Sequence, residues 1–378
     1  MSRRAVCCFA IMALSTMTAR PGSAQVMVGG GVDYMGYSFE EGLGAESAQL
    51  FMIPIALRFP ATERLSVDLY SAWAEGRVEQ GDAVLKLSGP VDTSIKAAYQ
   101  ATPWALVSLG LSLPTGNSTH DGEEAIVASV LSTDLLGFRE ASWGTGLAIT
   151  SSVASATTAG GFGLGIAAAY AMRGSFEPSQ DVALIYQPGN EARIRVGLDR
   201  NFGASTLTAG ATLVSYAKDQ ADDRNLFQAG QRIRLDASYA FRASSGVWTV
   251  YAADLMRASG DLFVDIVDEG GATVGETIVA TAEQNMLVGG VMGTVSLGGG
   301  FVFRPHVDYS RQTRRAADGN EAGSGWILAA GGDIPIRVFG GYEFFPKARV
   351  YFGSIRDFAG GGVSLLGLEV KGTVRTTF

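Results

Sequence analysis

Cysteine, histidine and long apolar runs are all scarce in this sequence. The two cysteines, Cys7 and Cys8, lie within the first ten residues, and the two histidines are His120 and His306. A small secreted fold stapled by disulfides is therefore excluded. Beyond the N-terminal region no uninterrupted apolar stretch reaches about 18 residues, the length needed for a membrane-spanning helix. Transmembrane helices are excluded for the remainder of the chain.

The N-terminus has the pattern of a secretory signal. Arg3 and Arg4 precede an apolar run, and the small residues Gly22, Ser23 and Ala24 provide a cleavage site before Gln25. We expect residues 1–24 to be removed, which leaves 25–378 as one domain with neither cysteine. That removal takes away three arginines and no acids, so 26 basic residues face 37 acidic ones, a net charge of −11. Nucleic acid is not expected as a partner.

Glycine and apolar residues are abundant, whereas charged residues are few. There are 50 glycines in 378 residues, 47% of the chain is hydrophobic and only 17% is charged, which is too apolar for a disordered protein. An exported, apolar chain without spanning helices is either a large soluble β protein or a β-barrel of an outer membrane. The pattern of side chains along its strands distinguishes the two.

Several distant segments alternate strictly between apolar and charged residues. In "QRIRLDASYAFR", Ile233 and Leu235 share one face while Arg232, Arg234 and Asp236 share the other. The segments "RIRVGLDRNF", "FVFRPHVDYS" and the C-terminal "GLEVKGTVRTTF" repeat the pattern. Successive strand residues point to opposite faces, so each segment separates an apolar environment from a wet one. We expect the apolar face to meet lipid and the charged face to meet a water-filled lumen.

The connections between these segments alternate between short and long, as they do in outer-membrane barrels. Six short links and a less clear seventh separate eight longer loops, at 40–49, 78–90, 114–140, 174–189, 218–225, 259–279, 312–322 and 356–361. Eight loops predict sixteen strands, and fusing one ambiguous hairpin would give fourteen. The predicted fold is therefore all-β, a single transmembrane antiparallel up-and-down β-barrel with one short helical insert near 122–136.

Phe378 ends the chain, and Val374, Val370 and Leu368 precede it on the same face of the last strand. With this ending the strand resembles the last strand of outer-membrane β-barrel proteins of Gram-negative bacteria, and the whole chain looks porin-like. In that class this pattern is the signal read by the barrel-assembly machinery. The resemblance implies the bacterial outer membrane as location, the general secretory route as export path, and lipid, lipopolysaccharide and the assembly machinery as partners.

A narrower resemblance concerns two short motifs. "GLSLPTGNS" and "WGTGLAI" are similar to segments of the long-chain fatty-acid transporter superfamily and of related barrels associated with aromatic degradation. This resemblance implies a gated transporter of hydrophobic or aromatic compounds. The N-terminal plug of the fatty-acid transporters, with its Asn-Pro-Ala sequence, is absent here.

Basic residues outnumber acids on the faces expected to line the lumen. The candidates for solute selection are Arg193, Arg195, Arg232, Arg234, Asp236, Arg304, His306, Asp308, Lys371 and Arg375. Such a lining favours anions, as charged rings do in selective pores. The alternative is a network of ion pairs in which each arginine is neutralised by a nearby acid. The sequence leaves both open.

The long loop at 114–140 contains the helical insert. Asp121 is a candidate helix cap, and Glu123 and Glu124 suit a first turn. Together with Asp134 these residues are candidates for a constriction inside the barrel, although an extracellular cap or a further β excursion would also fit.

The most direct function is passive passage of small solutes through a channel, with an anion preference. A non-transporting structural or surface-interaction barrel is a third alternative. His306 and Asp308 share a face, but no serine is placed near them, so we expect no catalytic site, metal or cofactor. Solute identity, an open or plugged lumen and the oligomeric state are left open.

Overall fold

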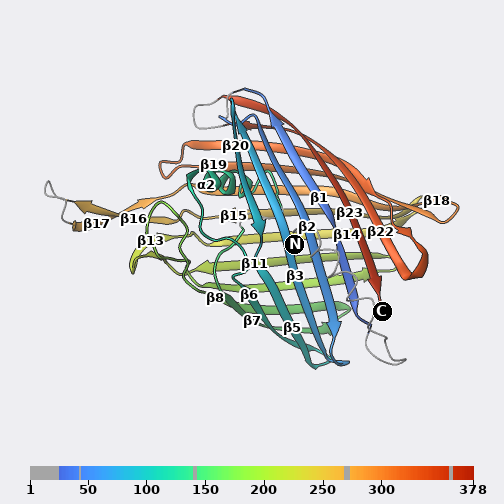
Figure 1. Cartoon of the computed structure of the whole chain (residues 1–378). Coiled ribbons are helices and arrows are strands. Elements are labelled where there is room, and N and C mark those ends of the chain that lie inside the picture. Colours follow the sequence, from blue (N-terminus) through green and yellow to red (C-terminus); the bar gives the residue numbers. More distant parts are fainter. Residues whose placement is uncertain (1–24, 42–43, 139–142, 268–272, 357–360) are drawn as a thin grey trace, which may run out of the picture.

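The computed structural model describes residues 25–41, 44–138, 143–267, 273–356 and 361–378. The expected signal segment lies outside these ranges. Within them, sixteen strands follow one another around a ring, each antiparallel to its neighbours (Figure 1). In ring order they are β1 (Met27–Phe39), β2 (Ser47–Pro60), β3 (Leu65–Gln80), β5 (Thr93–Thr102), β6 (Ala105–Leu113), β7 (Ala148–Ala159), β8 (Phe162–Arg173), β10 (Glu191–Phe202), β11 (Ser205–Tyr216), β14 (Arg232–Ala243), β15 (Gly246–Arg257), β18 (Glu283–Gly298), β19 (Phe301–Arg315), β20 (Glu321–Asp333), β22 (Tyr342–Arg356) and β23 (Gly362–Thr377).

The ring closes between the first and last strands. β1 and β23 pair in register from Met27 opposite Thr377 to Phe39 opposite Leu365. Beyond them Val26 and Phe378 exchange two backbone hydrogen bonds of 3.0 and 2.9 Å. Closure gives each of the sixteen ring strands a partner on both sides, as a lipid-facing sheet requires. The predicted barrel is confirmed, with sixteen strands rather than fourteen.

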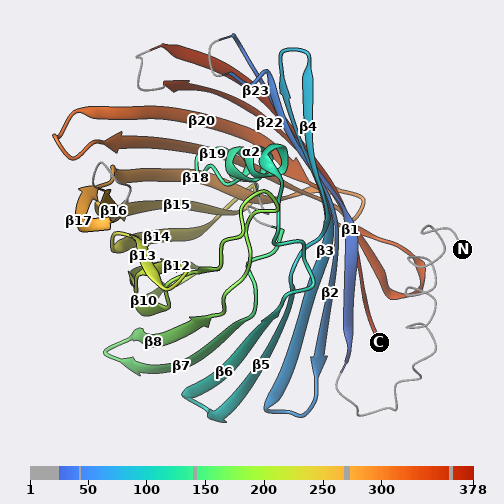
Figure 2. The ribbon, with the colours of Figure 1, turned by 60° about the vertical axis from the view of Figure 1, so that its left-hand side comes forward.

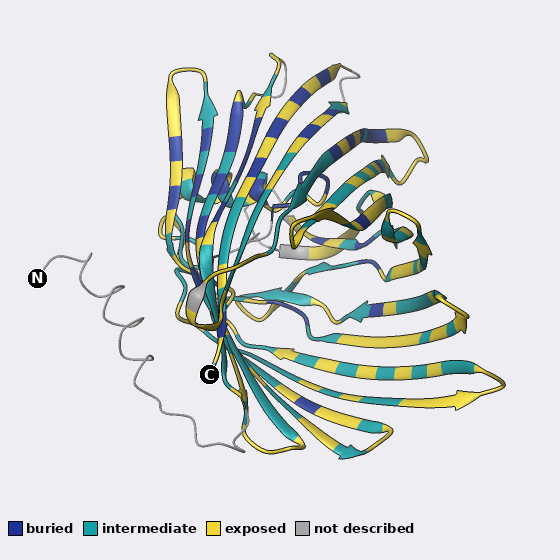
Figure 3. Cartoon of the chain, turned by 90° about the vertical axis from the view of Figure 1, so that its right-hand side faces the viewer, coloured by how far each residue is buried: buried dark blue, intermediate teal, exposed yellow. Residues whose placement is uncertain are grey.

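The apolar faces of the strands point outward. Ile233 and Leu235 are 40% and 46% exposed, and Leu368 and Val370 are 44% and 48% exposed. Their charged neighbours point inward, and Glu369 between the last two is only 3% exposed. Exposed and less exposed residues consequently alternate in bands along the strands in Figure 3. A closed ring with an apolar outside and an ionic inside is an outer-membrane-type, porin-like β-barrel.

The two ends of the barrel differ. At one end, which we call the short-turn end, strands are joined by tight turns such as Gly203–Ala204, and the start of β1 and the end of β23 lie there. Gly203 adopts a φ of +61°, a left-handed value that suits glycine in such a turn. The seventh, less clear link contains β21 (Ile336–Arg337) and a short 3-10 turn, η2 (Phe339–Gly341).

At the other end, the long-loop end, several predicted loops are themselves β structure. β4 (Ala83–Pro90) pairs with the far half of β3 to form an arm beyond the ring. A second, five-stranded sheet is built from β9 (Tyr186–Gln187), β12 (Asp219–Ala221), β13 (Arg224–Gln228), β16 (Asp261–Val267) and β17 (Thr273–Ala280). Two predicted loops are shorter than expected because the barrel strands run further, 40–46 instead of 40–49 and 316–320 instead of 312–322, whereas the connection from β6 to β7 is longer, 114–147 instead of 114–140.

One helix, α2 (Gly122–Leu131), lies inside the ring of strands (Figure 2). Its start follows from a capping box: the Asp121 carboxylate accepts from the Glu124 backbone N–H at 2.8 Å, and Glu124 accepts in return from the Asp121 backbone N–H. The predicted helical insert is confirmed, although the helix ends at Leu131 rather than near 136. In the described part of the chain no helix is long and apolar enough to span a membrane.

Candidate functional site

Residues 114–147, which we call the crossing segment, connect β6 to β7, and their described parts, 114–138 and 143–147, enter the lumen. Both ends of the segment are held by Asp92. Its Oδ1 accepts from the Gly116 N–H at 3.0 Å and its Oδ2 from the Thr145 N–H at 2.8 Å. The Asp92 N–H donates to the carbonyl of Trp143 at 3.1 Å. The two motifs noted in the sequence, "GLSLPTGNS" and "WGTGLAI", contain these ends, so their residues close the base of the crossing segment.

Helix α2 is docked on the inner face of the β2–β4 wall. Val127, Leu131 and Trp143 are buried to 1% exposure or less. They pack over Gly76 of β3, where a Cβ would collide with all three. The Trp143 indole N–H also donates to the carbonyl of Ala74 at 3.3 Å. An apolar core therefore lies within the lumen itself and fixes the crossing segment to one wall.

Beyond α2 the crossing segment reaches the opposite side of the ring. The Asp134 carboxylate accepts from Gln284 of β18 at 2.8 Å and lies 3.8 Å from Arg257 of β15. The chain then turns back, and the Tyr37 hydroxyl of β1 donates to the carbonyl of Leu136 at 2.8 Å. Because β3 and β18 lie on opposite sides of the ring, the segment divides the mouth of the barrel.

The four predicted constriction residues have different positions. Asp121 and Glu124 are occupied with each other at the start of α2, and Glu123 is exposed in its first turn. Asp134 alone bridges to the far wall. Its position after the helix, rather than within it, could not be read from helical spacing.

The arginines of β10 and β14 line the lumen and are partly neutralised. Arg195 makes two 2.8 Å hydrogen bonds to the carboxylate of Asp236, and Arg234 lies 3.5 Å from the same acid. Arg193 and Arg173 share Glu191. Nearby acids on the same wall therefore balance part of the positive charge of these arginines.

A cavity of about 560 Å³ at the long-loop end, which we call the arginine cavity, is more strongly basic. Its lining includes five arginines and two acids, namely Arg173, Arg193, Arg232, Arg257, Arg314, Glu191 and Asp219. Within the described ranges, Arg232 and Arg314 have neither an ion pair nor a side-chain hydrogen bond. Sequence reasoning missed Arg173, Arg257 and Arg314 because they lie at strand ends beside the predicted loops. An inward-facing basic residue at each strand end was the available signal.

Asp219, the second acid of the arginine cavity, accepts hydrogen bonds from groups other than arginine. Asp219 accepts from the Tyr186 hydroxyl at 2.5 Å and from the Gly189 N–H at 2.6 Å. Burial, with a further contribution from this hydrogen bond, raises the pKa of Tyr186 above its usual value. Asp219 thus holds β9 of the loop sheet in place and is not paired with an arginine in the described structure.

The wall that continues from the arginines is lined by small side chains. Gly165, Ala167 and Ala169 of β8 face the lumen beside Arg193 and Arg195. On the next two strands this face continues with Ala154, Ser152 and Thr150 of β7 and with Leu106, Ser108 and Gly110 of β6, so Leu106 is the one large residue among them. Arg193 lines the arginine cavity and also a second cavity at the long-loop end, which likewise has a volume of about 560 Å³. Arg195 lines two cavities toward the short-turn end, of about 380 and 890 Å³. Cavities therefore follow β10 along its length.

The remaining predicted lumen residues form ion pairs on the opposite wall. Arg304 lies 3.5 Å from Asp333, and Lys371 lies 3.3 Å from Asp33. Arg375 pairs with Glu343, with 3.2 Å between its Nε and the carboxylate. Asp308 pairs with Arg349 and not with His306, so the pair considered for acid–base chemistry is not formed. In the part of the chain that the structure describes, no cluster of three or more potential ligands could hold a metal ion.

Comparisons with known proteins find only distant similarity. No family model matches the chain, and no curated protein matches it. Among solved structures, the chain is similar to OccK9 (OpdG) of Pseudomonas aeruginosa at 12% identity, covering 94% of this chain and 98% of that one with a TM-score of 0.48. OccK1 (OpdK) of the same organism matches at 8% identity, covering 94% and 98%, with a TM-score of 0.47. OmpT, an outer membrane protein of Vibrio cholerae, matches at 10% identity, covering 96% and 99%, with a TM-score of 0.44.

Proposed function

We propose that this barrel is a channel for passive passage of small anionic solutes across the bacterial outer membrane. The observation that carries the proposal is the row of cavities along β10, which has arginines on one side and small residues on the other. Small side chains leave room for a solute, and guanidinium groups replace part of the hydration shell of an anion. Export by the general secretory route, and assembly through the Phe378 signal, belong to the same proposal.

The arginine cavity supports the sign of the preference. Glu191 balances part of the positive charge of Arg173 and Arg193, whereas no acid pairs with Arg232 or Arg314 in the described structure. The low-dielectric walls of this concave cavity focus the electric field of the two unpaired arginines. Because this cavity lies at the long-loop end, anions would be concentrated at the outer mouth before they reach the Arg195 and Asp236 pair.

The two other functions make different demands. A gated transporter of hydrophobic compounds needs an apolar path, and the cavities along β10 are lined by arginines. A non-transporting barrel needs a filled lumen, and the crossing segment docks on the β2–β4 wall while the β6–β11 wall keeps its cavities.

The direct test is the reversal potential of the purified protein in planar bilayers under a tenfold potassium chloride gradient. We expect stable conductance with a preference for chloride. Changing Arg232 and Arg314 to glutamine together should lower the chloride-to-potassium permeability ratio by about two- to fivefold, as expected for two charges about 10 Å from the path in a watery lumen.

The matched control changes two arginines that lie away from the lumen. Arg224 is in the loop sheet with a 70% exposed side chain, and Arg337 is beside the short-turn end with a 92% exposed one. Glutamine at both positions removes the same charge and should leave the ratio unchanged. Absence of conductance, a preference for potassium, or equal ratios in the two double variants would overturn the proposal.

A further inference from the structure

Four of the five arginines that line the arginine cavity lie in one row across the barrel wall. In register from β10 to β19, the row consists of Arg193, Val214, Arg232, Arg257, Gln284 and Arg314. All of these residues except Val214 line the arginine cavity. Neighbouring strands lie about 4.8 Å apart, so the part of the row from Arg232 to Arg314 spans about 14 Å.

This part of the row carries more positive than negative charge. Arg232 and Arg257 are directly opposite each other on paired strands, a position in which like charges are destabilising. Among the described residues, Asp134 of the crossing segment supplies the acid: its carboxylate accepts from Gln284 at 2.8 Å and lies 3.8 Å from Arg257. Arg232 and Arg314 have no ion pair in the described ranges. Three arginines and one acid leave an excess of two positive charges.

The contact of Asp134 with the row lies between two cavities. Gln284 and Arg257 line the arginine cavity, whereas Asp134 lines a cavity of about 720 Å³ on the other side of the crossing segment. The Asp134 side chain is 44% exposed and that of Arg257 is 35% exposed. Ion pairs with this degree of exposure contribute little to stability. An anion in the lumen can therefore replace the Asp134 carboxylate without opening a packed core.

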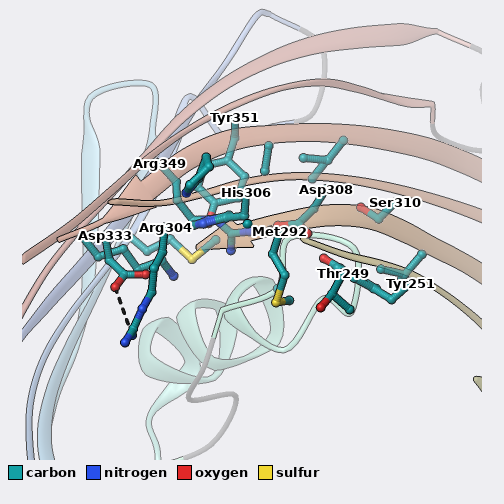
Figure 4. A pocket seen from close by; sticks show the side chains of 18 of the residues that line it. Thr249, Tyr251, Met292, Arg304, His306, Asp308, Ser310, Asp333, Arg349 and Tyr351 are labelled. Atoms are coloured by element: carbon teal, nitrogen blue, oxygen red, sulfur yellow. Dashed lines mark hydrogen bonds and ion pairs between the residues drawn. The ribbon is translucent and has the colours of Figure 1, made fainter. Parts of the chain in front are cut away.

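The cations of this neighbouring cavity are already neutralised. They are Arg304, Lys347 and Arg349, and each has an acidic partner. The pair of Arg304 with Asp333, 3.5 Å apart, is marked by the dashed line in Figure 4. An anion therefore finds uncompensated positive charge in the arginine cavity and not on this side of the crossing segment.

The side chains of the row indicate which kind of anion fits. Arginine offers only donors, and the Gln284 amide nitrogen already donates to a carboxylate oxygen. The two oxygens of Asp134 leave Arg232 and Arg314 without a partner in the described structure. A tetrahedral oxyanion presents oxygens in four directions, and guanidinium groups form charge-assisted hydrogen bonds to them. Two negative charges would balance the excess of two positive ones.

We propose that Arg232, Arg257, Gln284 and Arg314 form a binding site for a divalent tetrahedral oxyanion, and that this ligand displaces the Asp134 carboxylate from the row. The proposal rests on the proposed function, because the arginine cavity is the outer end of the anion path. It adds a class of ligand that is held at this point. It also makes the contact between the crossing segment and the far wall dependent on that ligand.

Calorimetric titration of the purified barrel in a non-ionic detergent tests the site without any conductance. The probes are sulfate and methanesulfonate, which are both tetrahedral but differ by one charge and one oxygen. Ionic strength is held constant, because salt screens such interactions. We expect saturable binding of sulfate, and binding of methanesulfonate that is weaker by about tenfold, the effect of one charge-assisted hydrogen bond.

Two variants locate the binding. Arg257→Gln removes a cation from the middle of the row and should weaken sulfate binding by about tenfold. Asp134→Asn removes the competing charge and keeps the size of the side chain, so sulfate should bind about fivefold more tightly. The matched controls are Arg224→Gln and Asp265→Asn, which each break the 2.9 Å ion pair of the loop sheet and should leave sulfate binding unchanged.

Three results would overturn the site: no saturable binding of sulfate, equal binding of methanesulfonate, or unchanged binding in Arg257→Gln. Sulfate binding in Asp134→Asn that is no tighter than in the wild type would overturn the displacement of Asp134. A chloride-selective channel that does not bind sulfate would contradict this inference and leave the proposed function standing. A barrel that binds sulfate but does not conduct would overturn the proposed function alone.

Discussion

Replacing Trp143 with alanine should release the crossing segment from its wall while the barrel stays folded. Trp143 is fully buried inside the lumen, packs with Val127 and Leu131 over Gly76, and donates to the carbonyl of Ala74. The backbone ladder of the sixteen strands closes without its side chain. The cost of the substitution therefore falls on docking of the segment and not on closure of the ring.

The magnitude follows from the size of the lost side chain. Truncating a buried tryptophan to alanine costs about 3 to 5 kcal/mol, and about 1.4 kcal/mol corresponds to a factor of ten in an equilibrium. The undocked population should rise by about 100- to 4,000-fold. We expect larger single-channel conductance and more current noise, because the segment that divides the mouth is no longer held to the β2–β4 wall.

Single-channel recording together with heat-modifiable migration in gels measures both parts of this prediction. Trp326→Ala is the matched control, since Trp326 points outward and is 42% exposed. That variant should keep wild-type conductance. If Trp143→Ala folds and conducts with the same amplitude and noise as the wild type, the crossing segment does not limit the lumen.

Three further predictions concern other parts of the molecule. Asp236→Asn removes the acid that neutralises two lumen arginines, so the chloride-to-potassium permeability ratio should rise, and a fall or no change would count against the assigned path. Deleting Phe378 should lower the amount of folded barrel in cells while the purified chain still refolds in detergent, whereas unchanged assembly in cells would contradict its role as a signal. The raised pKa of Tyr186 keeps its phenol protonated and bonded to Asp219 above the usual tyrosine value of about 10, so its contribution to stability is full below that value and falls as pH rises from there to the folded-state pKa. Tyr186→Phe should therefore remove one late-titrating phenol from an ultraviolet titration, and an unchanged titration curve would contradict the assignment.

The architecture could be predicted because the bilayer imposes it on every strand. Each strand must present apolar residues at alternate positions, so Leu235 and Val370 carry the same information at distant points of the chain. Tight turns at one end and long connections at the other then gave the strand number. The predicted loops at 40–49 and 312–322 were too long because their strands continue beyond the apolar band, where no alternation is required.

The lumen could be predicted only in part because its contacts depend on register. Arg195 and Asp236 lie on strands separated by β11, and they meet because Gly210 between them has no side chain. The path of the crossing segment depends in the same way on Gly76 and Tyr37, which are far from it in sequence. The alternation of apolar and charged residues predicts that a side chain faces the lumen, but it does not predict which side chain it contacts there.

The most direct test of the account is a pair of single cysteines in neighbouring positions of β14, which the mature chain permits because both native cysteines lie in the expected signal segment. Ser238 faces the lumen beside Thr208, with 2.6 Å between their hydroxyls, and Ala237 is on the outward face. A negatively charged, membrane-impermeant thiol reagent should react with Ser238→Cys, reduce its current and act faster than a positively charged reagent, while Ala237→Cys stays unmodified. Modification of Ala237→Cys with no effect at Ser238→Cys would contradict the orientation of the barrel and the anion path together.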